Sequence, residues 1–277
     1  MSYFKTPLRY PGGKSKAIKR LETFFPYLGN YTHYREPFLG GGSVALYIAQ
    51  KYPHLKIHVN DKYSALHNFW YYLQNEGTML TDVIQRCIRE SKDKKKLFLD
   101  CKETVNNDEP SSFIHAVSFY ICNRCSFSGL TASGGFSKIA SEERFTENIA
   151  QDLIDYSILI KNWTITNWDY SRMMEDTDEK TFVYLDPPYD IKDSLYGNKG
   201  GMHKGFDHDR FARVCKESKL DQLISYNADE KVRERFDGWN MNAFSHTYSM
   251  QSVGDYAKEQ KKRKELVMWN YGITNYF

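Results

Sequence analysis

Cysteines are few in this sequence, and their spacing does not follow a disulfide framework. The five of them form an odd set, namely Cys87, Cys101, Cys122, Cys125 and Cys215. Cys122 and Cys125 have the spacing of a zinc ligand pair, but no second Cys or His pair is placed to complete four ligands. We therefore expect reduced thiols and no bound metal.

Long apolar runs are also missing. The first five residues, 1–5, lack the apolar core of a signal peptide, and no run approaches the ~18 apolar residues of a membrane span. The sequence shows no internal repeat and no low-complexity tail. Together these absences predict a cytoplasmic protein without a membrane segment.

Neither sign of charge is in large excess, since the formal net charge over 277 residues is only +3. Any affinity for nucleic acid must therefore come from local clusters of basic residues. Apolar residues make up 41% of the chain and charged residues 26%, as in an ordinary soluble globular protein. The aromatic share of 16% suits stacking on bases, and it suits a well-packed core equally.

The most informative stretch is an apolar run that ends in an acid and two prolines. Thr181–Leu185 is typical of a buried parallel strand, which must stop at Asp186 because proline lacks the N–H that a sheet needs. Pro187 and Pro188 stiffen the backbone beyond the carboxyl end of the strand, where open α/β sheets bind ligands. Carbonyl and carboxylate acceptors beside the ring of Tyr189 suit a planar amine-bearing ring. For this stretch alone, a strand followed by a simple proline turn is the weaker alternative.

Two glycine-rich stretches precede it. Residues 10–15, Tyr-Pro-Gly-Gly-Lys-Ser, lead into a helical pattern through Ile18, Leu21 and Phe25. A phosphate loop would need a glycine where Leu8 stands and an apolar strand before it, so an NTPase is excluded.

The second stretch, residues 36–43, lies between a predicted strand at 31–37 and a predicted helix at 44–50. A further strand at 56–59 ends at Asn60 and Asp61, where an acid is placed to take a ribose hydroxyl. This order of elements predicts a pocket for an adenosine-type cofactor.

Residues 65–160 are polar and helix-prone, with interruptions at 92–96 and 123–138. The second interruption is rich in glycine and serine, and its Arg, Lys and Phe residues suit DNA contacts, although it is also compatible with a simple connector. Strand-like runs follow at 163–168, 222–226, 241–248 and 266–271, with helices expected at 208–218 and 230–236. The basic turn at 257–264 is either a phosphate-contacting element or a solvated hairpin.

Three motifs in this order resemble the Dam-type DNA adenine-N6 methyltransferases: Tyr-Pro-Gly-Gly-Lys at 10–14, Glu-Pro-Phe-Leu-Gly-Gly-Gly-Ser at 36–43 and Asp-Pro-Pro-Tyr at 186–189. The resemblance implies an α/β fold, a Rossmann-like doubly wound sheet with an inserted, mainly helical target-recognition domain. The catalytic domain would comprise residues 1–64 and 161–277, and the inserted domain residues 65–160.

The resemblance also implies the cofactor, S-adenosylmethionine, which leaves as S-adenosylhomocysteine, and it implies no metal. The residues expected to bind the cofactor are Tyr10, Gly12, Lys14, Phe38, Gly40, Gly41, Gly42, Ser43, Asp61, Asp169 and Asp186. The catalytic residues would be Asp186, Pro187, Pro188 and Tyr189. The residues expected to contact DNA are Arg124, Ser126, Phe127, Ser128, Thr131, Ser133, Lys138, Lys261, Lys262 and Arg263.

The implied activity is methyl transfer to N6 of an adenine flipped out of double-stranded DNA. The family resemblance leaves open a bacterial nucleoid-associated protein or a phage-encoded one, a cognate restriction endonuclease as partner, and a monomer or a weak dimer. The region 123–138 departs from Dam enzymes that read GATC. Ser128 replaces an asparagine, Ala132 falls near an expected arginine, and the following loop is shorter. Because that arginine would read guanine, we expect a target other than strict GATC, or relaxed specificity.

Other activities remain open from the sequence. Any exocyclic amine suits such a pocket, so RNA or cytosine N4 are alternative targets, and a glutamine-modifying methyltransferase is a weaker one. A catalytically silent DNA-binding module of this fold is a different class, and the filled motif positions argue against it.

Overall fold

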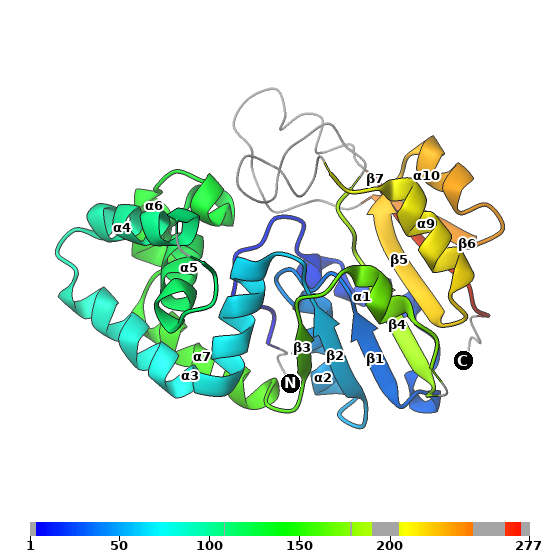
Figure 1. The fold of residues 1–277 in the computed structure, drawn as a ribbon, viewed down its shortest axis with the longest axis horizontal. Helices are drawn as coiled ribbons and strands as arrows, with labels where there is room; N and C mark the ends of the chain where they lie inside the picture. Colours follow the sequence, from blue (N-terminus) through cyan, green and yellow to red (C-terminus); the bar gives the residue numbers. More distant parts are fainter. Residues whose placement is uncertain (1–3, 108, 178, 190–204, 246–263, 273–277) are drawn as a thin grey trace.

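The computed structural model describes residues 4–107, 109–177, 179–189, 205–245 and 264–272. Its strands are β1 (His33–Glu36), β2 (Lys56–Asn60), β3 (Thr164–Thr166), β4 (Thr181–Leu185), β5 (Asp221–Asn227), β6 (Asn240–Ser245) and β7 (Lys264–Trp269). Within this described part, the strands form one seven-stranded sheet in the order β3-β2-β1-β4-β5-β7-β6 (Figure 1). The strands β1 to β5 run parallel, and β7 is antiparallel to both of its neighbours.

The central strand β4 is buried on both faces, as its continuous apolar run predicts. Phe182 and Tyr184 belong to one apolar cluster, while Val183 and Leu185 belong to a second cluster on the other face. Because side chains alternate along a strand, this division shows that helices must cover both faces of the sheet. The predicted doubly wound α/β sheet is confirmed.

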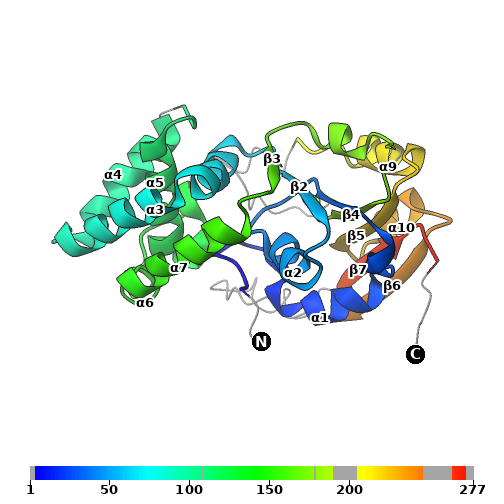
Figure 2. The ribbon, with the colours of Figure 1, turned by 90° about the horizontal axis from the view of Figure 1, so that it is seen from below.

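Helices lie on both sides of this sheet. They are α1 (Ile18–Leu21), α2 (Ser43–Lys51), α9 (His208–Glu217) and α10 (Glu230–Arg235). Figure 2 shows α1 and α2 on one side of the strands and α9 on the opposite side. The side chains of Asp207 and Asp229 accept hydrogen bonds from the first turns of α9 and α10, which fixes where those helices begin.

The predicted helix through Ile18 and Phe25 is broken into shorter pieces. The 3-10 turns η1 (Lys14–Lys16) and η2 (Glu22–Phe24) flank the single turn α1. Phe25 is already extended, with φ −67° and ψ 145°, because the proline that follows disfavours the helical conformation.

A group of five helices gathers beside the β3 edge of the sheet (Figure 1). They are α3 (Ser64–Glu90), α4 (Lys94–Asn107), α5 (Phe113–Cys125), α6 (Lys138–Glu143) and α7 (Glu147–Leu159). Ser112, Ser137 and Thr146 cap α5, α6 and α7 with their side-chain oxygens. This is the mainly helical region that the sequence predicts, and the exact domain boundaries at residues 65 and 160 stay a prediction.

Two predicted interruptions of this region differ in the structure. Asp93 caps the first turn of α4 by accepting from the backbone N–H groups of Lys95 and Lys96, so the charged stretch is already helical from Lys94. The helix α5 continues to Cys125, and the loop therefore begins later than expected. In the part of the chain that the structure describes, no helix is both long and apolar enough to cross a membrane.

Candidate active site

The carboxyl ends of the parallel strands bring distant acidic side chains to one edge of the sheet. Glu36 is the last residue of β1, Asp61 follows β2, and Asp186 follows β4. The antiparallel strand β7 begins at this same edge, because its Glu265 pairs in register with Asn227 at the end of β5. Ligands of open α/β sheets bind at this edge.

Lys14 of η1 reaches across this edge to Asp186. Its ammonium nitrogen lies 2.8 Å and 2.7 Å from the two carboxylate oxygens of Asp186, and it donates to the Tyr189 hydroxyl at 2.9 Å. It also lies 3.5 Å from Glu265 Oε1. The Lys14 side chain is only 3% exposed, so it pairs with these groups instead of with water.

The Asp186 carboxylate is held from further sides. Ser225 donates its hydroxyl to Asp186 Oδ1 at 3.1 Å, and Ser225 in turn hydrogen-bonds the buried hydroxyl of Tyr184 at 2.6 Å. Burial raises the pKa of Asp186, the nearby Lys14 lowers it, and the charge of Glu265 raises it again, with a net pKa above the usual value. Asp186 is thus a fixed acceptor with more proton affinity than an exposed aspartate.

The ring of Tyr189 is fixed at both ends. It stacks on Tyr226 with ring centroids 5.7 Å apart and an interplanar angle of 15°. Its hydroxyl donates to Glu265 Oε1 at 2.5 Å. Pro187 is buried and Pro188 half-buried, as expected for a stiff connection between the strand and this ring.

The glycine-rich turn between β1 and α2 needs glycine for two reasons. Gly40 and Gly42 have φ of 50° and 72°, in the left-handed region that favours glycine. A Cβ atom on Gly41 would lie 2.9 Å from Tyr10 Cβ, and one on Gly42 would lie 2.8 Å from the Trp70 ring. The turn is therefore packed closely between two aromatic side chains, and the Trp70 indole N–H donates to the Gly40 carbonyl at 3.1 Å.

Asp61 ties this turn to the end of β2. Its carboxylate accepts from the backbone N–H of Gly40 at 2.8 Å and from that of Tyr63 at 2.9 Å. Burial raises the pKa of Asp61 to about 6, although these two hydrogen bonds oppose the shift. The two glycine-rich stretches are joined by Ser15 and Ser43, whose hydroxyl oxygens are 2.9 Å apart.

The structure gives Asp169 a partner that the sequence did not reveal. The Arg210 guanidinium contacts both of its carboxylate oxygens, at 2.9 Å and 3.3 Å, and holds the pKa of Asp169 at about 2. Phe38 lies nearby in an aromatic cluster, with its ring centroid 5.4 Å from that of Tyr170 and 5.8 Å from that of Phe206.

Three predicted DNA-contacting residues lie inside the fold, because α5 ends against the N-terminal segment. Arg124 is 7% exposed, and its guanidinium donates to the carbonyls of Arg144 and Pro7. Ser126 and Thr131 are also buried. The structure thus buries three side chains for which DNA contacts are predicted. Phe127, Ser133 and Lys138 are exposed and Ser128 is half-buried, whereas Lys261, Lys262 and Arg263 lie outside the described residues.

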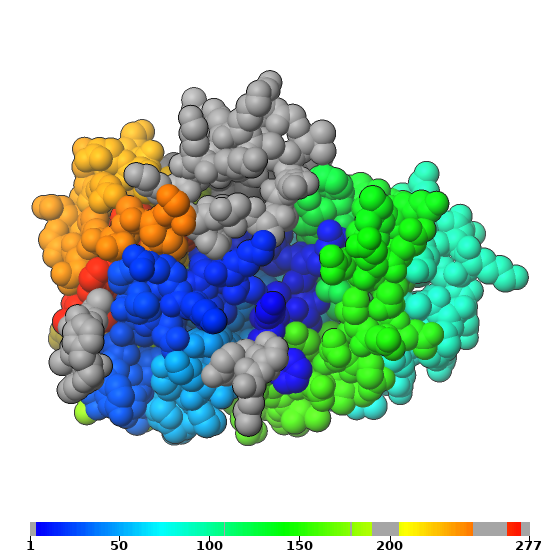
Figure 3. Space-filling view, turned by 180° about the vertical axis from the view of Figure 1, so that it is seen from behind, coloured from blue at the N-terminus to red at the C-terminus, as the bar shows by residue number. Residues whose placement is uncertain are grey.

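Arg9 and Asn123 are contacts that sequence reasoning missed. The Asn123 side chain accepts from the Arg9 N–H and donates to the Arg9 carbonyl, both at 2.8 Å. The Arg9 guanidinium donates to the Ser126 carbonyl at 2.7 Å. The N-terminal segment therefore joins the helical region to the sheet, and Figure 3 shows its dark blue atoms between those two parts. The Asn123 amide can bond the backbone of any neighbouring segment, and the sequence does not show that its neighbour is Arg9.

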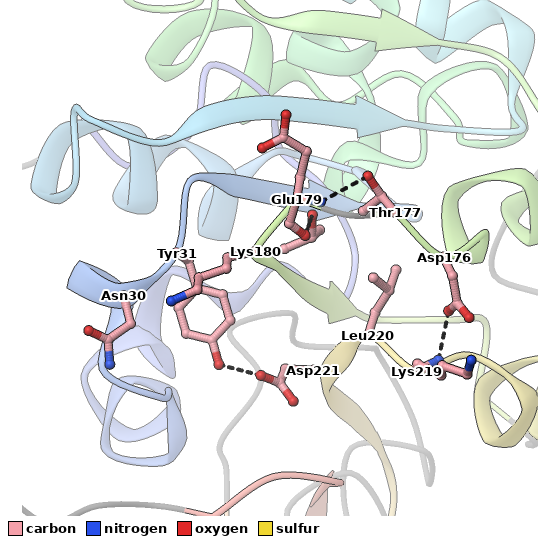
Figure 4. Close-up of a pocket in the computed structure, with 10 residues that line it drawn as sticks. Asn30, Tyr31, Asp176, Thr177, Glu179, Lys180, Lys219, Leu220 and Asp221 are labelled. Carbon is pink, nitrogen blue, oxygen red and sulfur yellow. Dashed lines mark hydrogen bonds between the residues drawn. The ribbon is translucent and has the colours of Figure 1, made fainter.

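A cavity of about 630 Å³ lies at the opposite edge of the sheet (Figure 4). It is lined by Asn30, Tyr31, Asp176, Thr177, Glu179, Lys180, Thr181, Lys219, Leu220 and Asp221. Thr181 and Asp221 are the first residues of β4 and β5, so this cavity is remote from Asp186. Within the described residues, no group of three or more His, Cys, Asp or Glu side chains is arranged to hold a metal ion.

Substitution of Gly129 tests the contact between the loop and the N-terminal segment. A Cβ atom there would lie 2.1 Å from the Arg9 carbonyl oxygen, and the residue has φ of 73°. We expect Gly129→Ala to lower the free energy of unfolding by about 2–4 kcal/mol, through both clash and backbone strain. The matched control is Gly238→Ala, with φ of 88° and no atom within 4 Å, which should cost only the strain of about 1 kcal/mol. Equal losses in denaturant unfolding would contradict the close approach of the two segments.

Comparison with known proteins gives a family match over nearly the whole chain. A family model described as D12 class N6 adenine-specific DNA methyltransferase matches residues 10–265. The Type II methyltransferase M.MjaIII of Methanocaldococcus jannaschii is 25% identical over 95% of this chain and 98% of its own length. M1.LlaDCHI of Lactococcus lactis subsp. cremoris, also named a Type II methyltransferase, is 24% identical over 95% of this chain and 94% of its own length. M.CviBI of Paramecium bursaria Chlorella virus NC1A, another Type II methyltransferase, is 23% identical over 96% of this chain and 100% of its own length.

Proposed function

The chain belongs to the D12 class N6 adenine-specific DNA methyltransferase family, and we propose how its residues divide the work of that reaction. As a DNA adenine methyltransferase it acts on the exocyclic amine of a base. In our proposal the segment Asp186–Tyr189 holds a target adenine that has been turned out of double-stranded DNA. The observation that carries this proposal is the fixed group of Lys14, Asp186 and Tyr189 at the carboxyl end of β4.

Base flipping is required by geometry, because an adenine amine inside a duplex is out of reach of the half-buried Asp186 carboxylate. Leaving the stack costs a few kcal/mol, and stacking on an aromatic side chain recovers roughly 1–3 kcal/mol. Tyr189 is the aromatic side chain that follows the catalytic carboxylate, and its contacts with Tyr226 and Glu265 hold it before any base arrives. A ring that is already fixed loses little entropy when a base stacks on it.

The N6 amine is a weak nucleophile because its lone pair is delocalised into the ring. Asp186 Oδ and the Pro187 carbonyl would accept hydrogen bonds from its two N–H groups and turn the lone pair toward the methyl donor. The raised pKa of Asp186 makes its carboxylate a strong acceptor, while Lys14 keeps the carboxylate in place. Positioning and stabilisation of the positive charge that develops on N6 then account for the rate.

Use of S-adenosylmethionine follows from the family. We infer that its site is the glycine-rich turn with its neighbours, namely Tyr10, Gly12, Phe38, Gly40, Gly41, Gly42, Ser43 and Asp61. The residues fit, because the left-handed glycines leave backbone N–H groups beside a carboxylate suited to ribose hydroxyls. When bound, the cofactor supplies an electrophilic methyl group on a sulfonium.

Lys14 contacts Asp186, which supports a role for Lys14 at the target base in addition to its expected role at the cofactor. Asp169 is predicted to lie near the cofactor adenine. Because it is paired with Arg210, it would contact that ring as part of this ion pair.

Recognition of DNA is assigned to the helical region 65–160 together with the final hairpin. The exposed residues Phe127, Ser133 and Lys138 support this assignment for the loop after α5. Ala132 is buried and has no long side chain to take the place of the arginine that reads guanine in GATC-specific enzymes, which supports a different or relaxed target. A cytoplasmic location, a cognate restriction endonuclease as partner, and a monomer or weak dimer are further parts of the proposal. The relatives named Type II methyltransferases support only a place among such enzymes.

The substrate and the catalytic carboxylate are tested together. Purified protein is given labelled S-adenosylmethionine and a panel of duplexes that differ only in sequence. We expect label in N6-methyladenine, at sites that are not restricted to GATC, and a loss of at least 100-fold in rate for Asp186→Ala. Asp237→Ala, an exposed aspartate remote from the site, should match the wild type. Label in cytosine, in RNA alone, or undiminished in Asp186→Ala would overturn the assignment.

The pH dependence of cofactor binding tests Asp61. Because its pKa is raised to about 6, Asp61 is mostly protonated at pH 5 and loses acceptor strength for ribose hydroxyls. Affinity for S-adenosylmethionine should therefore increase as pH rises through 6, by up to tenfold per pH unit below it. Calorimetric titration at pH 5, 6, 7 and 8 measures this. The Asp61→Asn variant should bind S-adenosylmethionine more weakly at pH 8, and its affinity should no longer change near pH 6. A change near pH 6 that persists in this variant would show that another group causes it.

A further inference from the structure

Glu265 is a buried acid that neither the family motifs nor the proposed reaction has so far used. Its side chain is 1% exposed, and it lies within hydrogen-bonding reach of the target-base segment. We propose that Glu265 is a positioning residue for methyl transfer: it anchors the Tyr189 hydroxyl and retains the Lys14 ammonium when the target amine engages Asp186. This inference rests on the proposed function, since it concerns the same site.

The first part of the proposal is the anchoring of Tyr189. The Tyr189 hydroxyl accepts a hydrogen bond from Lys14 at 2.9 Å and donates its own proton to Glu265 at 2.5 Å. A hydrogen bond to a charged acceptor is shorter and stronger than a neutral one. Two such bonds at the hydroxyl, with Tyr226 against the ring, leave the stacking ring in one orientation.

The second part concerns the charge of Lys14. Its ammonium contacts both oxygens of Asp186, the same atoms that must accept from the target amine. A buried ammonium cannot lose its partner without a large desolvation cost. Glu265 Oε1 lies only 3.5 Å from Lys14 Nζ, so a small movement transfers the ammonium from one carboxylate toward the other. Glu265 thereby lets Asp186 share an oxygen with the substrate while Lys14 stays paired.

The fold fixes Glu265 in this place. Strand β7 pairs with β5 on one side and β6 on the other, and in this register Glu265 lies opposite Asn227 and Phe244. Ser225 of β5, two residues before Asn227, donates to the same Asp186 carboxylate. A one-residue slip of β7 would turn Glu265 to the other face of the sheet, so the strand pairing itself positions the carboxylate.

The charged and titratable groups around Asp186 come from several elements. They are Lys14 of η1, Glu36 of β1, Tyr184 of β4, Tyr189 and Glu265. The charge of Glu265 raises the pKa of Asp186, second to burial among the raising effects. Replacing Glu265 by its neutral amide should therefore lower the pKa of Asp186.

The kinetic test uses Glu265→Gln, which keeps an acceptor oxygen but removes the charge. On a duplex that the wild type methylates, we expect the single-turnover rate to fall at least tenfold, with cofactor affinity within twofold. Tyr189→Phe, which keeps the ring, should show a similar loss. If Glu265 acts through the Tyr189 hydroxyl, the variant that carries both substitutions should be little slower than the slower of the two single variants. A rate loss equal to the product of the two single losses would overturn the anchoring.

The pH profile of the same single-turnover rate is the second readout. The acid limb for Glu265→Gln should lie at lower pH than that of the wild type, because a charge that disfavours ionised Asp186 has been removed. Glu234→Gln, an exposed acid of α10, is the matched control and should change neither rate nor profile. Thermal unfolding of each variant with cofactor bound shows that the fold is intact.

The outcomes separate the two proposals. A wild type that makes N6-methyladenine, with a Glu265→Gln variant of equal rate and equal pH profile, overturns the role of Glu265 and leaves the function intact. Absence of methyl transfer to any DNA by the wild type overturns the proposed function itself. A slower Glu265→Gln enzyme with a shifted acid limb supports the positioning role.

Discussion

The contact between the buried Lys14 and the half-buried Asp186 is the constraint on which the site depends. It joins the N-terminal segment to the carboxyl end of the central strand, and neither partner would keep its place alone. The Lys14 side chain is almost fully removed from water, so it needs the acceptors that Asp186, Tyr189, the Gly12 carbonyl and Glu265 provide. Since these acceptors come from opposite ends of the sequence, the charge of one lysine holds the site together.

The segment that carries Lys14 also connects the other two parts of the molecule. Asn123 of α5 binds both backbone groups of Arg9, and the residue after Arg9, Tyr10, packs on Gly40 and Gly41 of the glycine-rich turn. Within six residues, 9–14, the chain therefore touches the helical region, the glycine-rich turn and the Asp186 carboxylate. A displacement of the loop after α5 must be felt by this segment, because Gly129 lies directly against the Arg9 carbonyl. The position of this loop is thus linked to the position of Lys14.

The sequence was sufficient for the sheet, the glycine-rich turn and the end of β4, because each depends on local patterns. Thr181–Leu185 has a continuous apolar run, and the residues after it leave no choice about where the strand stops. Arg124 was misplaced because residue type alone does not reveal that a helix extends one turn further and turns its arginine toward two carbonyls. Glu265 was missed for a related reason. Its role depends on the register of an antiparallel strand that meets β5 from far along the sequence.

Three aspartates at one sheet edge show how environment separates their roles. Asp169 is paired with Arg210 and has a pKa of about 2, so it carries its charge at every physiological pH. Asp61 accepts from the backbone N–H groups of Gly40 and Tyr63, and its pKa of about 6 lets it change charge near neutrality. Asp186 is paired with Lys14, yet burial and the neighbouring Glu265 still raise its pKa. An acceptor for a developing cation is most effective when it holds a proton tightly and cannot move away. Asp186 meets both conditions, because Lys14 and Ser225 fix the carboxylate whose charge Glu265 disfavours.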